Sequence, residues 1–440
     1  MRLEEKLRQL KQATVRQSRD AGLEDALQHL RRLEKAPKKL PAKRVPKGIE
    51  AYVEGQVANN RWGEFFLARQ ALPFGRPYGK LRIGDVSTAD LSPLDLFLEN
   101  ASLPPPEQIV YLDTETTGLA GGTGTCAFLV GIGAAEGSQF VVRQFFLRDY
   151  PEEKAMLAAL TEALKPYQGL VTFNGKTFDV PLLETRYALA RLKSPLTELL
   201  HLDLLHPARR LWKLRLETCE LTHLEREVLG VSREGDVSGS EIPGIYFDYL
   251  RAGDAQGLQP VFYHNALDII TLAALTTELA KSVAQAGGER VLPSLDLFSL
   301  SRIYDRAGVT EQSLSACQQA LATGLPEEIE TRALLHLAAH HKRRCEYDVA
   351  VEIWSEVTRR ERGDFSLTAL EELAIHFEHR RRDYTAAINV VEKAIELLRD
   401  SARESSKPSP TAHPRHFERF TYRLKRLRRK SERAVSGSLL

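Results

Sequence analysis

The sequence predicts an α/β domain, a mixed β-sheet flanked by helices, followed by an all-helical domain. Three observations carry this prediction. Apolar runs of strand length recur between residues 109 and 173. Segments with a helical apolar period alternate with these runs as far as residue 280. Beyond about residue 290 the strand signal ends, and a repeat with a period in the mid-thirties begins.

The bulk composition excludes several classes of protein. Hydrophobic residues make up 43% and charged residues 27% of the 440 residues, which is ordinary for soluble globular domains. No apolar run approaches the roughly 20 residues of a membrane span, and the start of the chain does not resemble a secretory signal. The four cysteines have neither zinc-site spacing nor the density of a disulfide framework, so we expect a reducing, cytoplasmic setting.

The formal net charge of +2 conceals two basic ends. Residues 1–48 are predicted to form a basic helix and a linker rich in proline and lysine. Residues 406–440 form a basic tail, in which aromatic and cationic side chains alternate between Phe417 and Lys430. This alternation is typical of nucleic-acid contacts, although a solvated amphipathic helix, a disordered tail or a helix on an acidic membrane explains it equally well.

The segment between these ends divides into a short region and the α/β domain. Residues 49–106 are rich in turns and aromatic residues, and we expect a few strands that pack on the next domain. The α/β domain is assigned to residues 107–285. Its predicted strands are 109–112, 128–133, 139–146 and 169–173, and its predicted helices are 152–164, 181–192, part of 202–229, and 261–280. Residues 231–260 are rich in Gly and Asp and are predicted to be mostly loop.

Residues 290–405 contain an internal repeat. Residues 348–354 align with 385–391, and residues 313–319 form a third copy upstream. This period predicts stacked helical hairpins similar to tetratricopeptide repeats, which would offer a surface to a protein partner. An ordinary helical bundle is the alternative.

Two carboxylates follow the first predicted strand of the α/β domain. Asp113 and Glu115 are two residues apart in an extended segment, so both side chains point to the same face. Adjacent anions repel each other unless a cation lies between them, and Mg²⁺ and Mn²⁺ prefer such oxygen ligands. The pair is therefore predicted to bind metal.

Two further acids, Asp179 and Asp268, lie at the start of one predicted helix and within another. Asp179 follows the turn that begins at Phe173 and precedes a predicted helix, where a helix cap is the simpler explanation. Asp268 lies among apolar residues of the last predicted helix of the domain, and such a carboxylate is unfavourable unless it is paired or bound to metal.

In this order and context the four acids resemble the DEDD superfamily of 3′–5′ exonucleases, which share the ribonuclease H-like fold. The resemblance covers residues from about 107 to 280. The whole layout resembles bacterial YprB-type proteins, in which such a domain precedes helical repeats. The residues that match the three family motifs are Asp113 and Glu115, then Asn174, Phe178 and Asp179, and finally Asp268.

The resemblance implies a mixed five-stranded sheet flanked by helices and hydrolysis of phosphodiester bonds. Two Mg²⁺ or Mn²⁺ ions would be held by the four acids, and the substrate would be single-stranded DNA or RNA. Asn174, Thr116 and Phe178 are expected to contact this substrate.

The third motif departs from both branches of the superfamily, which have either tyrosine four residues or histidine five residues before the aspartate. Here His264 is four residues and Tyr263 five residues before Asp268. Residues four apart share a helix face, and histidine serves as a base near neutral pH. We therefore favour His264 as the general base, with Tyr263 as the alternative, while simple packing at a helix start explains either residue.

Two other functions are consistent with the sequence. One is an interaction scaffold whose nuclease domain binds nucleic acid without cutting it. The other is a structure-specific endonuclease, because one fold supports several chemistries. The complete set of four acids favours hydrolysis.

Overall fold

The computed structural model describes residues 47–118, 124–284, 291–360, 363–404 and 413–437. All of them except Lys47 belong to one compact unit, Gly48–Leu440. The predicted basic helix and linker of residues 1–48 thus lie outside the described residues, apart from the last two. None of the helices in the described ranges has both the length and the apolarity needed to cross a membrane.

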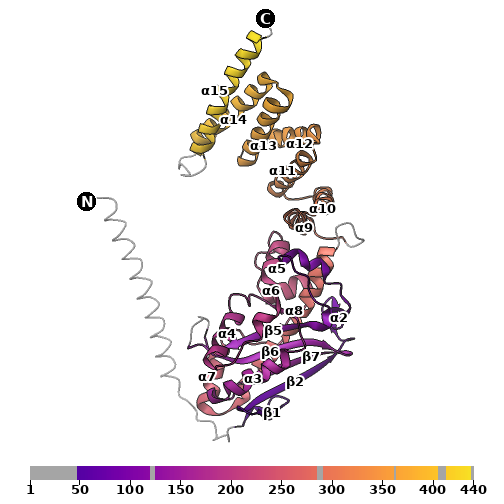
Figure 1. Cartoon of the computed structure of the whole chain (residues 1–440), viewed down its shortest axis with the longest axis vertical. Coiled ribbons are helices and arrows are strands. Elements are labelled where there is room, and N and C mark those ends of the chain that lie inside the picture. Colours follow the sequence, from indigo (N-terminus) through magenta and orange to yellow (C-terminus); the bar gives the residue numbers. More distant parts are fainter. Residues whose placement is uncertain (1–46, 119–123, 285–290, 361–362, 405–412, 438–440) are drawn as a thin grey trace, which may run out of the picture. The chain divides into compact units, whose positions relative to one another are not determined.

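A seven-stranded mixed sheet with the order β1-β2-β7-β6-β5-β8-β9 forms the centre of the α/β domain (Figure 1). Strands β5, β8 and β9 run parallel, and the remaining neighbours are antiparallel. The strands are β1 (Gly55–Asn60), β2 (Gly63–Pro73), β5 (Ile109–Thr116), β6 (Ala127–Glu136), β7 (Gln139–Phe146), β8 (Gly169–Thr172) and β9 (Leu200–Asp203). The smaller elements β3 (Pro77–Tyr78), β4 (Leu81–Arg82) and α2 (Asp85–Thr88) follow β2.

The mixed α/β sheet is confirmed, but the expected number of five strands is too low. Five strands do come from residues 107–285, and β1 and β2 from the preceding segment extend the sheet to seven. The segment 49–106 therefore supplies strands to the sheet itself. Its hairpin pairs with β7 through a long antiparallel register, from Phe66 opposite Phe146 to Pro73 opposite Gln139.

Two elements differ from the sequence prediction. Strand β9 ends at Asp203, within a region where helices were expected, because its four residues pair with β8. Helix α7 (Ile242–Ala252) lies in the segment predicted to be mostly loop. Its apolar residues lie one helical turn apart, and the ring of Tyr246 stacks on Phe128 at a centroid distance of 4.0 Å. The Gly and Asp content of the flanking residues concealed this short apolar period.

Helices cover both faces of the sheet. Strand β5 shows the division, because Val110 and Leu112 belong to one core while Ile109 and Tyr111 belong to the other. The first core contains α3, α4 and α7, and the second contains α5 and most of α8. The helices of this domain are α3 (Glu153–Leu164), α4 (Asp179–Leu189), α5 (Leu205–Trp212), α6 (Leu221–Leu224), α7 and α8 (Gln259–Ala284).

An all-helical region follows, as predicted. The three repeat copies fall in α10, α12 and α14, each of which packs against the helix before it. Two equivalent ion pairs, Arg344 to Glu311 and Arg381 to Asp348, each join residues 33 positions apart, near the period of the repeat. The helices are α9 (Ser294–Arg306), α10 (Thr310–Thr323), α11 (Glu327–Arg343), α12 (Tyr347–Arg360), α13 (Asp364–His376), α14 (Tyr384–Glu404) and α15 (His413–Gly437).

The basic segment after residue 405 contains helix α15. Its residues Phe420 and Leu427 are buried in a core shared with α13 and α14. Several of its cations converge on the buried carboxylate of Glu378, including Arg426 and Lys430. Part of the positive charge read from the sequence is therefore neutralised within the helical region.

Candidate active site

The two carboxylates of the first motif lie at the end of β5, as the sequence predicted. Asp113 and Glu115 follow Ile109 and Tyr111 at a spacing of two residues, so they point to the face of the sheet that α8 covers. The pairing of β5 with β6 shifts register between Glu115 and Thr116, where the strand leaves the sheet. Both carboxylates are thereby held at a strand terminus under a helix.

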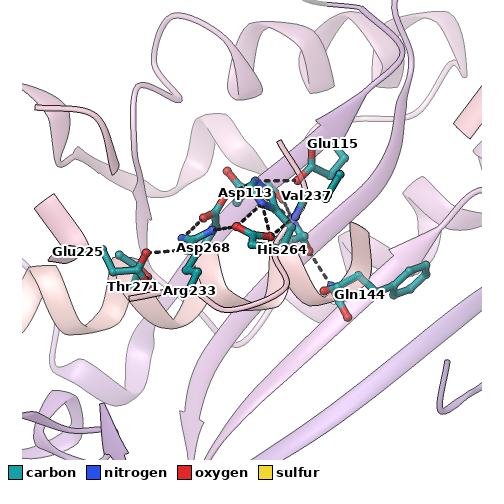
Figure 2. Close-up of polar contacts among 12 residues, drawn as sticks. Asp113, Glu115, Gln144, Glu225, Arg233, Val237, His264, Asp268 and Thr271 are labelled. Carbon is teal, nitrogen blue, oxygen red and sulfur yellow. Dashed lines mark hydrogen bonds and ion pairs between the residues drawn. The ribbon is translucent and has the colours of Figure 1, made fainter. Parts of the chain in front are cut away.

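Helix α8 brings three polar side chains against this strand end (Figure 2). Asn265 donates to Oδ2 of Asp113 at 2.9 Å and accepts from Gln144 at 2.9 Å. A side chain at position 131 of β6 would exclude it, because a Cβ atom on Gly131 would lie 2.2 Å from Oδ1 of Asn265. Sequence reasoning missed Asn265, although an amide three residues before Asp268 in an apolar helix is itself a signal.

His264 points into the site, and the carboxylate of Asp236 holds its ring on the side away from the other acids. Its Nδ1 lies 2.8 and 2.9 Å from the two carboxylate oxygens of Asp236, while its Nε2 lies 3.4 Å from Oδ2 of Asp268 and 4.0 Å from Oε1 of Glu115. Tyr263, one position earlier on the helix, is 45% exposed. The four-residue spacing on α8 thus places the histidine, and not the tyrosine, beside the carboxylates.

A buried arginine that the sequence analysis did not identify also reaches the site. The guanidinium of Arg233 pairs with Asp268, Asp236 and the almost fully buried Glu225 (Figure 2). Both Arg233 and Asp236 come from the segment between α6 and α7, far from the acids in sequence. Nothing in the local pattern of this Gly-rich segment marks them, because their partners lie on α8 and in the helical turn Glu225–Leu229.

The second motif forms a tight turn between β8 and α4. Asn174 has a left-handed backbone (φ +64°), and its N–H and that of Lys176 donate to the carboxylate of Asp203 at 2.7 and 3.0 Å. Asp203 also accepts from the N–H of Leu205 at 3.1 Å, so its carboxylate joins this turn to the start of α5. The turn delivers Asp179 to the site, where its Oδ1 accepts from the hydroxyl of Thr114.

The four acids of the site share one electrostatic environment. Burial, followed by the charges of Asp268, Asp179 and Glu115, holds the pKa of Asp113 well above its ordinary value. Burial also raises the pKa of Asp179 to about 6 and that of Asp268, although Arg233 and His264 act in the opposite direction on Asp268. Converging anions of this kind are unfavourable without a compensating cation.

The donor set fits a hard divalent cation. Ligand atoms of Glu115, His264 and Asp268 all lie within 4.8 Å of one another. Asp113 and Asp179 lie outside that close group. Asp113 is nevertheless close enough for the charges of Asp268, Asp179 and Glu115 to raise its pKa. The carboxylate oxygens of this set suit Mg²⁺ or Mn²⁺.

A cleft of about 420 Å³ opens beside the acids. Thr116, Phe178 and Asp179 line it, and the ring of Phe178 is 52% exposed. Two of the three residues expected to contact substrate therefore border one cavity. Asn174 is not among the residues that line it, and its observed role is to form the turn.

Comparison with known proteins places these features in context. Residues 110–280 match the RNase_H superfamily (RNase_H_2). The protein YprB of Bacillus subtilis (strain 168) is 30% identical over 308 residues, which cover 70% of this chain and 73% of YprB. Among solved structures, the family B DNA polymerase of the hyperthermophilic archaeon Pyrobaculum calidifontis aligns with a TM-score of 0.34 and 13% identity, over 59% of this chain and 34% of the polymerase chain.

Proposed function

Because the chain belongs to the family of Bacillus subtilis YprB and residues 110–280 form a domain of the RNase_H superfamily, we propose that it is a metal-dependent 3′–5′ exonuclease. The observation that carries the proposal is the buried convergence of Glu115, Asp268 and His264, with Asp113 alongside. The order of the acidic motifs along the chain supports the exonuclease class. The exposed ring of Phe178 beside the cleft suits an unpaired terminal base, which favours single-stranded DNA or RNA.

In this mechanism the protein's own residues position the phosphodiester and move one proton. Two Mg²⁺ or Mn²⁺ ions held by Asp113, Glu115, Asp179 and Asp268 would supply Lewis-acid stabilisation of the charge that develops at the phosphate. Asp236 accepts the Nδ1 proton of His264, which leaves Nε2 free to take a proton from the attacking water.

The decisive experiment follows 5′-labelled DNA and RNA oligonucleotides incubated with the full-length protein and Mg²⁺ or Mn²⁺. A ladder of progressively shorter labelled products, absent with Asp113→Ala, is the expected result. Internal cuts at a junction would instead indicate an endonuclease. Oligonucleotide binding without cleavage under either metal would reject hydrolysis and leave a nucleic-acid-binding scaffold.

The general base is tested by comparing two neighbouring substitutions. We expect His264→Ala to lower kcat by about 10²-fold or more, because a positioned general base contributes at least that much. Tyr263→Phe should leave kcat unchanged, since Tyr263 is 45% exposed and lies on another face of α8. Single-turnover cleavage at saturating substrate measures both, and loss of activity in the tyrosine variant alone would refute the choice of His264.

The substrate cleft is tested at Phe178. Stacking of a base on an aromatic ring contributes about 1–3 kcal/mol, so Phe178→Ala is expected to raise KM roughly tenfold with a smaller effect on kcat. Leu189→Ala is the matched control, because Leu189 is 54% exposed at the C-terminal end of α4, the helix that Phe178 precedes, and does not line the cleft. Equal KM values for the two variants would remove Phe178 from the substrate site.

For the helical region we propose tetratricopeptide-like repeats that bind a protein partner. The support is the succession of helical hairpins and the recurrence of an Arg–acid pair at a separation of 33 residues. In such arrays each repeat contacts mainly its neighbours.

A further inference from the structure

A second cleft, of about 330 Å³, lies between α5 and α9 and away from the acids. Its cations come from both helices and the residue that follows α5, and no acidic side chain lines it. The cationic residues are Arg209, Arg210, Lys213, Arg302 and Arg306. This concentration of one sign of charge differs from the rest of the helical region, where arginines such as Arg344 and Arg381 pair with acids.

The positive charge in this cleft is not neutralised by the described part of the chain. Arg209, Arg210, Arg302 and Arg306 form no ion pair with a carboxylate in the described ranges. Burial, followed by the positive charges of Arg332 and Arg306, lowers the pKa of Arg302. Cations that repel one another in a concave site are stabilised by an anion from outside the protein.

A buried hydroxyl provides an independent indication of a ligand. Ser299 lines the same cleft and is only 1% exposed, yet its Oγ has no hydrogen-bond partner among the described residues. Buried polar groups are nearly always hydrogen-bonded, so an unpaired buried hydroxyl in a cleft indicates that a ligand supplies the acceptor. A phosphate oxygen would satisfy both the hydroxyl and the arginines.

The cleft is connected to the candidate active site through α5. This helix begins immediately after β9, where Asp203 binds the backbone of the turn that carries the second motif. His206, in the first turn of α5, already lines the cleft. Because β5, β8 and β9 are parallel, their carboxyl ends lie at the same edge of the sheet. In the strand order β5-β8-β9, the turn after β8 comes next to the end of β5, and the start of α5 follows it along the same edge.

We propose that the cleft between α5 and α9 binds the phosphodiester backbone of the nucleic acid whose end occupies the active site. The inference rests on the proposed nuclease function and extends it, since it assigns a track for the strand upstream of the scissile bond. Five cations from α5, the residue after it and α9 exceed the need of a single phosphate and match successive phosphates of a backbone.

The test measures binding separately from cleavage. Fluorescence anisotropy with a labelled single-stranded 20-mer, in EDTA, gives the Kd of the full-length protein at several salt concentrations. Arg302→Gln combined with Arg306→Gln is expected to weaken binding at least tenfold and to reduce the salt slope by about 1.4, because each lost phosphate contact removes about 0.7. The exposed pair Arg209→Gln with Arg210→Gln should have the same effect without disturbing a buried residue.

The matched control removes two cations elsewhere in the helical region. Arg359→Gln combined with Lys393→Gln gives the same change in net charge outside the cleft and should leave Kd unchanged. Equal affinity of the wild-type protein and both cleft variants for the 20-mer would overturn the inference. Binding of inorganic phosphate in the cleft would not rescue it if the variants bind the 20-mer as tightly as wild type. If the protein shortens oligonucleotides stepwise but the cleft variants bind the 20-mer as tightly as wild type, only the proposed role of the cleft is refuted. If the cleft variants weaken binding but no stepwise shortening is seen, only the proposed nuclease activity is refuted.

Discussion

Asp113→Asn is expected to lower the rate of hydrolysis by roughly 10³-fold and, in the absence of divalent ions, to raise the melting temperature. Loss of several kcal/mol of charge stabilisation at the phosphate corresponds to about three powers of ten in rate. The gain in stability has a separate cause. Burial and the charges of Asp268, Asp179 and Glu115 disfavour the ionised form of Asp113, and a neutral amide removes that repulsion.

The same substitution should weaken the response of the protein to metal. An ion present at 100 times its Kd stabilises the native state by about 2.7 kcal/mol, so Mn²⁺ should raise the melting temperature of the wild-type protein clearly. Thermal melts with EDTA and with Mn²⁺ measure both effects. Asp248→Asn is the control, because Asp248 is exposed and its ion pair within the described ranges is with the exposed Arg251. A metal-free melting temperature that falls in Asp113→Asn would contradict the electrostatic account.

Arg233→Met is expected to destabilise the metal-free protein by about 3–5 kcal/mol. The guanidinium pairs with three carboxylates at once, and the side chain of Glu225 is only 1% exposed. Removal of the cation leaves these buried charges without compensation. Because Asp268 is one of them, divalent ions should recover part of the lost stability.

An exposed arginine provides the matched control. Arg251 and Asp248 form an ion pair with side chains that are 74% and 76% exposed, so Arg251→Met should change stability by less than about 1 kcal/mol. Thermal and denaturant unfolding of both variants measure the difference. Equal stabilities would mean that Arg233 is not needed to balance the buried acids.

Much of the candidate site follows from local patterns along the chain. Asp113 and Glu115 were predictable because an extended strand fixes the direction of side chains two residues apart. The position of His264 beside Asp268 follows equally from the four-residue period of a helix. The α/β class and the helical repeats rest on periodicities of the same local kind.

Other features depend on contacts between segments that are distant in sequence. Asp236 and Arg233 come from a Gly-rich segment with no recognisable motif, and only the folded chain sets them against His264 and Asp268. Strand β9 and the extension of the sheet by β1 and β2 likewise arise from pairing between strands.

The sequence by itself therefore determined the acids of the candidate site, the α/β class and the helical character of the second half. The tertiary structure alone decided which charges balance those acids, how many strands the sheet contains, and where unpaired cations gather between α5 and α9. The physical reason is the sequence separation over which each kind of interaction acts. Helix and strand periods act over a few residues, whereas hydrogen bonds between strands, ion pairs and clefts require segments that only folding brings together.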